Sequence, residues 1–337
     1  MIAISFYSHL THQMTQKIEL FCQLQTNIGL HQVLLYSQAM EPKKKIEFCV
    51  AENEKDNIEG FCIIHKKFPI VYIQDGPIVS KNEHLSVIIL AIKKYYSRHL
   101  FAFSTIQLPF SEKQISVDLY NNPSISQVFD LPTWSTIIIN TSNIETLLKS
   151  FSKGHLSAIK KAKKEGITTS DSFSDDTIKS FVNIFDANYK TRGLATQWAN
   201  TKTYFTHLSA TMAFNNSFFI GAYKNDNLVA GGIFLVYGNT IHYKFGTSNY
   251  ELRSIPLMHT VIYQAILKAK ELNFSIFDLG GINPDAIDGS QVRSINTFKK
   301  GFGGTIITSP KRIYLTNNPL SLTIVLLLLK IKHLIHK

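Results

Sequence analysis

The sequence predicts an α/β protein (α+β in its sheet arrangement) made of two similar units that follow one another along the chain. Between Thr240 and Leu279 a strand, a helix and a second strand succeed each other, and a comparable order occurs between Asp56 and Leu108. With 337 residues and 45% hydrophobic side chains, the chain is long enough to form two cores of ordinary size. Its 18% charged content is typical of a folded globular protein.

The helix of the second unit is expected at Pro256–Glu271. Its apolar residues recur at helical spacing and form one stripe, made of Leu257, Val261, Ile262, Ala265, Ile266 and Ala269. Pro256 suits a first helical turn, and Asn273 suits a stop. The flanking strands are expected at Thr240–Phe245 and Phe274–Leu279. A helix between two strands favours a parallel pair, whose ligands gather beyond the carboxyl ends of the strands.

Two glycines, Gly280 and Gly281, follow the second strand and mark the mouth of the cleft that such a pair forms. The run Phe298–Gly304 comes shortly afterwards and contains Lys299. We expect this run in a loop that is free to fold back over the two glycines. The sequence therefore directs the search for chemistry to this end of the sheet.

The N-terminal unit repeats the same order in a plainer form. Strands are expected at Phe61–Ile64 and Val71–Ile73, then a helix from about Leu85 to Tyr96, then a strand at Ala102–Leu108. The two copies share a pattern rather than identity, so either duplication of one α/β unit or chance accounts for it. With the junction near residue 150, the expected domains are 1–150 and 151–337.

A basic helix is expected at Ser152–Glu165, where the second domain begins. The whole chain has a formal net charge of +11, from 35 basic and 24 acidic residues, which favours an anionic partner. The clustered lysines of this helix form either a solvated face or a phosphate-contacting surface that would release the counterions of a polyanion. The candidate anion-binding residues are Lys160, Lys161, Lys163 and Lys164.

Cysteine and histidine usage points to a cytoplasmic protein without a metal. Cys22, Cys49 and Cys62 fit neither a disulfide framework nor a paired metal motif, and indicate a reducing compartment. The twelve histidines show no H-E-x-x-H or comparable spacing. The N-terminus lacks the features of a signal peptide. No apolar run reaches the ~18–20 residues that span a bilayer.

The C-terminal tail is apolar over Leu320–Leu329 and continues with Lys330 and Lys332. It is expected either as a terminal helix packed on the body or as an interfacial anchor whose lysines face anionic lipid at the inner face of the membrane.

Several motifs together resemble the Fem family of peptidoglycan-bridge aminoacyltransferases. They are Gln74-Asp-Gly-Pro77, Ile159-Lys-Lys-Ala-Lys-Lys-Glu-Gly-Ile167, Tyr189-Lys-Thr-Arg192, Tyr243-Lys-Phe-Gly-Thr-Ser248, Phe277-Asp-Leu-Gly-Gly281 and Phe298-Lys-Lys-Gly-Phe-Gly-Gly304. The resemblance covers most of residues 55–310. It implies two tandem acetyltransferase-like (GNAT) domains, each a mixed sheet flanked by helices, in the compact form without the family's long helical hairpin. Asp75 departs from the arginine that the family usually carries in this turn.

The resemblance implies transfer of an aminoacyl group from aminoacyl-tRNA to an amine of a peptidoglycan precursor. In such a reaction the carbonyl oxygen becomes negative, and losing one donor to it typically costs ~3 kcal/mol. By position, Lys299 would be the catalytic cation and Phe298 would shape the acceptor-end pocket; the alternative for Lys299 is a surface lysine in a turn. Arg192 would bind a phosphate or carboxylate of a nucleotide- or lipid-linked sugar precursor, or form a structural salt bridge.

The remaining substrate-binding candidates are Tyr243, Tyr250, Asp278, Gly280 and Gly281. The tyrosines either donate hydrogen bonds to the precursor or belong to the core. Asp278 either orients or deprotonates the amine or caps the next turn. The loop after Phe245 lacks the glycine pattern that holds the pyrophosphate of acetyl-CoA, which favours aminoacyl-tRNA over acyl-CoA as donor, with no tightly bound cofactor.

Two other functions stay open at this point. One is an acyl-CoA-dependent N-acyltransferase that acts on an amino sugar of a surface polysaccharide. The other is a non-catalytic RNA- or membrane-binding module on a GNAT scaffold. Whichever of the three functions holds, we expect a monomer.

Overall fold

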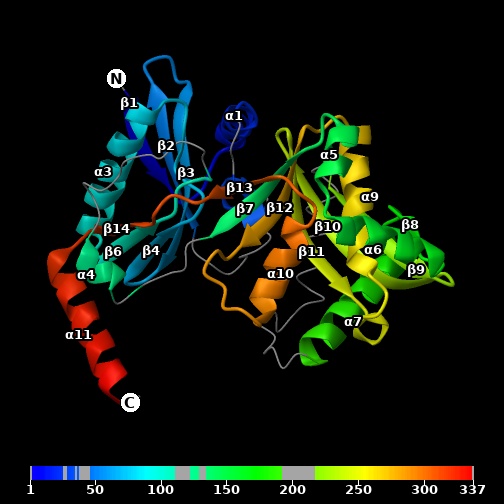
Figure 1. The fold of residues 1–337 in the computed structure, drawn as a ribbon. Helices are drawn as coiled ribbons and strands as arrows, with labels where there is room; N and C mark the ends of the chain where they lie inside the picture. The colour runs from blue at the N-terminus through cyan, green and yellow to red at the C-terminus, as the bar shows by residue number, and fades with distance from the viewer. Residues whose placement is uncertain are drawn as a thin grey trace. The chain divides into compact units, whose positions relative to one another are not determined.

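Two mixed β-sheets, each with its own helices, make up the chain in a computed structural model (Figure 1). The structure describes residues 2–25, 29–34, 36–37, 46–110, 122–127, 129, 134–191 and 217–335. One unit consists of Met1–Trp134 with Thr308–Lys337, and the other of Ser135–Ile307. This division differs from the expected domains 1–150 and 151–337, because β7 (Ser135–Asn140) pairs with the second sheet and β14 (Ile313–Thr316) returns to the first.

The second unit contains a seven-stranded sheet in the order β13-β7-β12-β11-β10-β9-β8. Besides β7, its strands are β8 (Thr168–Ser170), β9 (Phe218–Lys224), β10 (Asn227–Tyr237), β11 (Thr240–Ser248), β12 (Ile276–Ile282) and β13 (Thr305–Thr308). Its helices are α5 (Ile144–Ser150), α6 (Lys153–Lys164), α7 (Asp175–Thr191), the 3-10 turn η3 (Tyr250–Leu252), α9 (Leu257–Glu271) and α10 (Gln291–Lys300).

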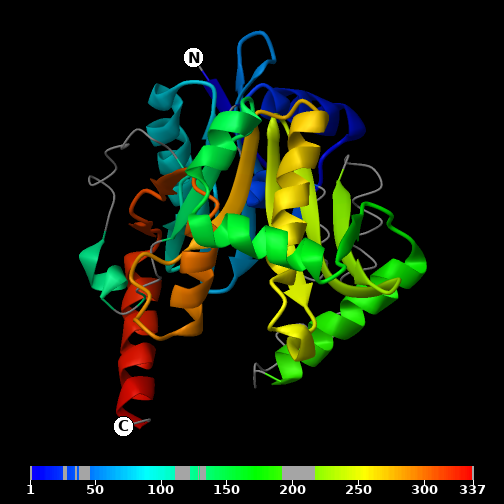
Figure 2. The same ribbon diagram turned by 45° about the vertical axis from the view of Figure 1, so that its right-hand side comes forward.

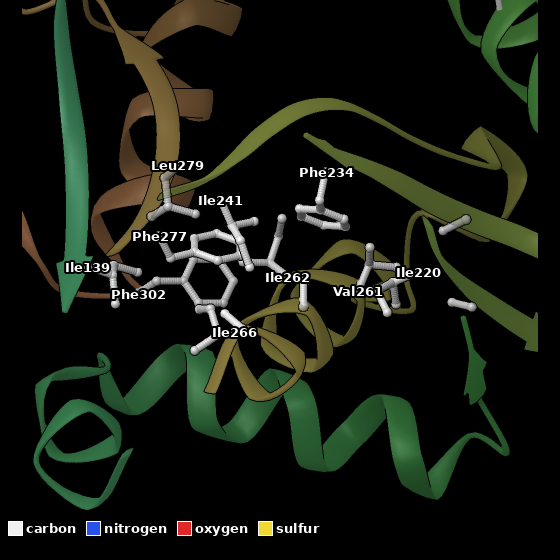
Figure 3. Close-up of a cluster of buried hydrophobic side chains, with 14 of the residues drawn as sticks. Ile139, Ile220, Phe234, Ile241, Val261, Ile262, Ile266, Phe277, Leu279 and Phe302 are labelled. Atoms are coloured by element: carbon white, nitrogen blue, oxygen red, sulfur yellow. The ribbon is translucent and has the colours of Figure 1, made fainter. Parts of the chain in front are cut away.

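The predicted strand–helix–strand is confirmed as β11, α9 and β12, with β11 and β12 parallel. All six residues of the predicted stripe are buried, and Pro256 is the N-cap of α9. Figure 3 shows Val261, Ile262 and Ile266 in the same cluster as Ile241 and Phe277 of the strands. Burying each large aliphatic side chain contributes about 1.5–3 kcal/mol, so this stripe fixes α9 on the sheet.

The first unit has a sheet in the order β1-β2-β3-β4-β6-β14, with β5 paired to β3. Its other strands are β1 (Ile2–Tyr7), β2 (Ile46–Asn53), β3 (Ile58–Lys67), β4 (Ile70–Ile73), β5 (Ile78–Val79) and β6 (Phe103–Ile106). Its helices are α1 (His12–Gln23), the 3-10 turn η1 (Leu30–Gln32), α3 (Asn82–Arg98), α4 (Pro123–Ser126) and α11 (Pro319–Ile335).

The two units repeat one connection. In the first, the hairpin β3–β4 leads through α3 to β6, which is parallel to β4; in the second, β10–β11 leads through α9 to the parallel β12. The strand that follows the helix, β6 in the first unit and β12 in the second, also pairs with an antiparallel strand on its other side. This partner is β14 for β6 and β7 for β12. Figure 2 shows α9 and α6 on one face of the second sheet. The predicted fold class is confirmed.

Two local expectations at the end of the sheet were wrong. The strand does not stop at Leu279 but runs through Gly280 and Gly281 to Ile282. Phe298 and Lys299 lie in the last turn of α10 rather than in a loop. Ser290 caps the start of this helix by accepting a hydrogen bond from the amide of Arg293 at 3.2 Å.

Within the part of the chain that the structure describes, no helix combines the length and the apolar character needed to cross a membrane.

Candidate functional site

The candidate site begins where β11 and β12 stop pairing. Their register covers only three residue pairs and ends at His242 opposite Asp278, although both strands continue. On the other side of β12 the register with β7 shifts between Asp278 and Gly281. Gly280 lies at this shift with φ 75°, a conformation that a residue with a Cβ rarely adopts. The backbone groups that follow Asp278 are thereby open to partners other than β11.

Lys299, at the end of α10, contacts the part of β12 that follows Asp278. Its half-buried Nζ donates a hydrogen bond to the carbonyl oxygen of Gly281 at 2.8 Å and lies 5.9 Å from the ring centroid of Tyr243. A Cβ at Gly280 would lie 3.5 Å from that Nζ and 3.1 Å from the carbonyl oxygen of Tyr243. The positive φ and the close carbonyl of Tyr243 therefore favour glycine here, while a Cβ would be in ordinary contact with the ammonium group.

Three hydrogen bonds fix α10 against the sheet. Asn296, the buried residue of this helix, donates through Nδ2 to the carbonyl of Asn283 at 2.5 Å and accepts from the amide of Asn283 at 3.2 Å. After the helix, the amide of Ser152 donates to the carbonyl of Gly301 at 2.9 Å. Lys299 thus extends from a helix that is held near its middle and just after its C-terminal end.

Asp278 forms the polar centre beside this lysine. Its carboxylate accepts hydrogen bonds from the hydroxyl of Thr136, from Nδ1 of His242 at 3.2 Å and from the amide of Gly280 at 2.8 Å. Burial alone would raise the pKa of Asp278, but the interactions with His242, Thr136 and the Gly280 amide outweigh it and lower that pKa below its ordinary value. The carboxylate is therefore held in its charged form.

The pKa of Lys299 results from opposing influences. It falls from 10.5 to about 8, mainly because of burial; the charge of Asp278 opposes this fall and the charge of Lys244 adds to it. At neutral pH the ammonium form still predominates. The site therefore presents a positive group with a depressed pKa, kept charged by a buried carboxylate.

Phe298 belongs to an aromatic cluster on the other side of the helix end. Its ring centroid lies 5.8 Å from that of His155, 4.9 Å from that of His259 and 5.3 Å from that of Phe302. Because a carbonyl only accepts, Nε2 of His155 donates to the carbonyl of Phe298, at 2.8 Å. Burial lowers the pKa of both histidines, that of His259 to about 4, so the cluster is uncharged at neutral pH.

The two candidate tyrosines lie in different surroundings. Tyr243 is half-buried in the core beside Phe234, with ring centroids 5.5 Å apart, and burial raises the pKa of its hydroxyl. Tyr250 is exposed in η3, where the guanidinium of Arg253 lies 4.8 Å from its ring centroid. The structure thus brings Tyr243 to Lys299 and pairs Tyr250 with Arg253 instead.

The candidate anion-binding lysines lie along α6, and Arg192 lies outside the described residues. The side chains of Lys160, Lys161, Lys163 and Lys164 are exposed. Among them Lys161 donates to the carbonyl of Ser254 at 2.9 Å. No salt bridge joins these four lysines to another described residue. Their positive face is available to a polyanion.

Four residues of the site were missed by the sequence analysis: Thr136, His155, His242 and His259. The spacing of the histidines matches no metal-binding motif, and within the described ranges no group of three or more His, Cys, Asp or Glu side chains could hold a metal ion. His242 and Asp278 are 36 positions apart and meet only because their strands are parallel neighbours. The alternation of His242 with the core residues Ile241 and Tyr243 was the available signal that its side chain lies on the opposite face of β11.

A known protein family matches the region of the chain that contains most of this site. Residues 187–328 match the model of the FemAB family. The FemAB region contains β10, β11, α9, β12 and α10, and therefore Tyr243, Asp278 and Lys299.

Solved structures that are similar to the chain in fold cover both of its units. A structure of FemX has a TM-score of 0.73 at 17% identity, covering 95% of this chain and 99% of FemX. A tandem GNAT protein from the clavulanic acid biosynthesis pathway has a TM-score of 0.54 at 8% identity, covering 94% and 99%. The C-terminal domain of a putative lysylphosphatidylglycerol synthetase from Agrobacterium fabrum has a TM-score of 0.57 at 10% identity, covering 94% and 96%.

At these identities the likeness concerns the fold alone. No curated protein matches the chain in sequence. The expected tandem GNAT architecture and the resemblance to the Fem family are both confirmed by these findings.

Proposed function

We propose that the chain is an acyltransferase that moves an aminoacyl group from aminoacyl-tRNA to an amine of a peptidoglycan precursor. The observation that carries the proposal is the ammonium group of Lys299, held between β11 and β12 beside the Asp278 carboxylate. The FemAB match over residues 187–328 and the FemX-like fold support the transferase class. The aminoacyl donor and the acceptor amine are the finer part of the proposal.

In the proposed reaction a neutral amine attacks the ester carbonyl of the aminoacyl-tRNA. A carbon–nitrogen bond forms, the carbonyl oxygen becomes negative, and the carbon–oxygen bond to the ribose then breaks. The ribose oxygen leaves with a proton and the amine has lost one, so charge is balanced. The Lys299 ammonium stabilises the oxyanion, and groups in this role typically contribute 10²–10³-fold to the rate.

Asp278 acts in this scheme as a positioning residue. Its oxygens already accept hydrogen bonds from Thr136, His242 and Gly280. These partners keep it charged, and its charge raises the pKa of Lys299 against the effect of burial. We therefore assign Asp278 the role of keeping Lys299 protonated at neutral pH. The same carboxylate also caps the turn at Gly280 by accepting a hydrogen bond from its amide.

The donor assignment rests on charge. The exposed lysines of α6 form a basic face in the same unit as Lys299. Such a face attracts the phosphates of a tRNA. No tightly bound cofactor enters the scheme. The nucleotide- or lipid-linked acceptor and a cytoplasmic location, where charged tRNA is present, are parts of the same proposal.

The test is a transfer assay with the purified full chain. Radiolabelled aminoacyl-tRNA and radiolabelled acetyl-CoA are offered separately, each with a nucleotide-linked muropeptide or an amino-sugar acceptor, and acid-stable amide product is measured. Amide product from aminoacyl-tRNA and the muropeptide supports the proposal. Product from acetyl-CoA alone would show that acyl-CoA, and not aminoacyl-tRNA, is the donor. No product from either donor would identify a non-catalytic module.

A further inference from the structure

The C-terminal helix α11 packs on its unit through one face only. Leu322 is buried, and Val325 and Leu326 are partly buried, in a cluster with Ile70 and Phe103 of the sheet. The start of the helix is tied to the same place, because the amides of residues 317 and 318 donate to the carbonyl of Ala102 at 3.0 and 3.2 Å. Burial of this face holds the helix on the first unit.

The opposite face of α11 is apolar and exposed. Four large side chains follow one another at helical spacing with exposed fractions of 52–73%, namely Leu320, Ile324, Leu327 and Leu328. Single exposed apolar residues are ordinary on a protein surface, but a continuous stripe of this kind marks an interaction site. Figures 1 and 2 show the C-terminal half of α11 extending past the strands and helices of its unit.

Two further exposed apolar side chains belong to the turns beside the start of α11. Phe68 is 69% exposed and Leu100 is 59% exposed. Their turns meet at a hydrogen bond from the amide of Ala102 to the carbonyl of Pro69 at 2.9 Å. The same Ala102 accepts from residues 317 and 318, so the two turns adjoin the base of the helix.

The charges around this surface are basic. From Gly289 to the C-terminus the sequence contains no Asp or Glu, and Lys330, Lys332 and Lys337 follow the apolar stripe. Lys67 and Arg98, next to the exposed Phe68 and Leu100 turns, are exposed as well. An apolar stripe bordered by lysine and arginine complements a bilayer surface of anionic lipid, which attracts each basic group and accepts the apolar side chains below its headgroups.

We propose that α11, with the turns of Phe68 and Leu100, is a peripheral membrane-binding surface for anionic bilayers. The helix lies along the interface, because its Leu322 face stays packed on the first unit while the Leu320–Leu328 face enters the headgroup region. This surface shares no residue with the Lys299 site and requires neither substrate. Its function would be to keep the enzyme at the surface where lipid-linked acceptors are found.

The test is flotation of the full chain with vesicles of phosphatidylcholine, with and without phosphatidylglycerol, in the absence of any substrate. The variant Ile324→Glu/Leu327→Glu places two charges on the exposed stripe. The control Val87→Glu/Leu90→Glu makes the same change at two exposed positions of α3, in the same unit and also three residues apart. Circular dichroism establishes that both variants are folded.

The proposal expects the wild-type chain and the α3 control to float with phosphatidylglycerol vesicles, and added salt to weaken this binding. The α11 variant should bind at least about tenfold more weakly, because two leucine-sized side chains no longer enter the lipid. Equal binding of all three proteins, or no binding by the wild type, would overturn the proposal. Another contradicting result would come from light scattering. If the wild type and the α3 control are dimers, the α11 variant is a monomer, and all three bind vesicles equally, the exposed face is a dimer interface instead. Because no donor or acceptor is present, the result is independent of the proposed transfer reaction.

Discussion

The Nζ of Lys299 lies 2.8 Å from the carbonyl oxygen of Gly281, inside the opening that forms when β11 and β12 cease to pair. A hydrogen bond to a strand carbonyl fixes the position of the ammonium group but not its charge. The charge depends on Asp278, which raises the pKa of Lys299 while burial and Lys244 lower it. Position and protonation of the same group are thus set by different parts of the second unit.

The first prediction concerns the pH dependence of the chemical step. The ammonium form of Lys299 is the active one, and its pKa is about 8. The single-turnover rate of transfer, divided by the fraction of acceptor amine that is neutral, should therefore be constant below this pH and decline as pH rises through it. In Lys299→Arg the group stays charged, so whatever activity remains should show no such decline. A wild-type rate that, after the same division by the neutral amine fraction, shows no decline beyond pH 9 would show that the charged lysine is not required.

The second prediction concerns Asp278→Asn. Without the carboxylate, nothing offsets the burial of Lys299, and the decline in rate should move to lower pH by about one unit, since a nearby opposite charge typically shifts a pKa by 1–3 units. Single-turnover rates across the pH range measure this shift. The melting temperature of the variant separates a general loss of folding from the effect on Lys299. An unchanged pH midpoint in a folded variant would remove Asp278 from the account.

The third prediction concerns tRNA binding by α6. Changing Lys160, Lys163 and Lys164 to alanine should weaken binding of aminoacyl-tRNA and reduce the slope of log affinity against log salt by roughly 2–3. Filter binding at several salt concentrations measures both. The turnover rate at saturating tRNA should stay unchanged.

A matched control for this experiment lies on the other unit. Lys81, Lys93 and Lys94 are exposed at or near α3, and changing them to alanine removes the same charge. If both triple variants lose affinity equally, only the net charge of +11 matters and α6 has no particular role.

The fourth prediction concerns acid stability. The pKa of His259 falls from 6.5 to about 4 on folding, mainly through burial and secondarily through His155. The unfolded chain therefore binds a proton below pH 6.5 that the folded chain refuses, and the free energy of unfolding should fall between pH 6.5 and 4, by on the order of 2 kcal/mol from this residue. Urea denaturation followed by circular dichroism measures it. His259→Leu should lose part of this slope, and an identical slope in both proteins would contradict the assignment.

The spacing of apolar residues was enough to predict α9, because the residues that form its apolar stripe are the ones that pack into the core. All six residues of the stripe are buried. The same approach failed for α10, whose Val292 and Ile295 are about 40% exposed and whose buried residue is the polar Asn296. Because this helix is held by hydrogen bonds between Asn296 and Asn283, its sequence contains no periodic pattern of apolar residues that would predict it.

The domain boundary was out of reach for a related reason. Strands β7 and β14 join their sheets through β12 and β6, partners far away in the sequence. Nothing in the local composition near residue 150 signals this pairing. The contact of His242 with Asp278 is long-range in the same way, so the sequence indicated Lys299 and Asp278 separately but not the groups that control their charges.

The central claim is that the Lys299 ammonium drives acyl transfer, and the most direct test is the single-turnover rate at neutral pH of wild type, Lys299→Ala and Lys300→Ala. Lys300 is the neighbouring lysine of α10 and is exposed, so its loss controls for charge and helix stability. The account predicts that Lys299→Ala slows transfer by about 10²–10³-fold while Lys300→Ala transfers at the wild-type rate. Equal rates for the three folded proteins would contradict it.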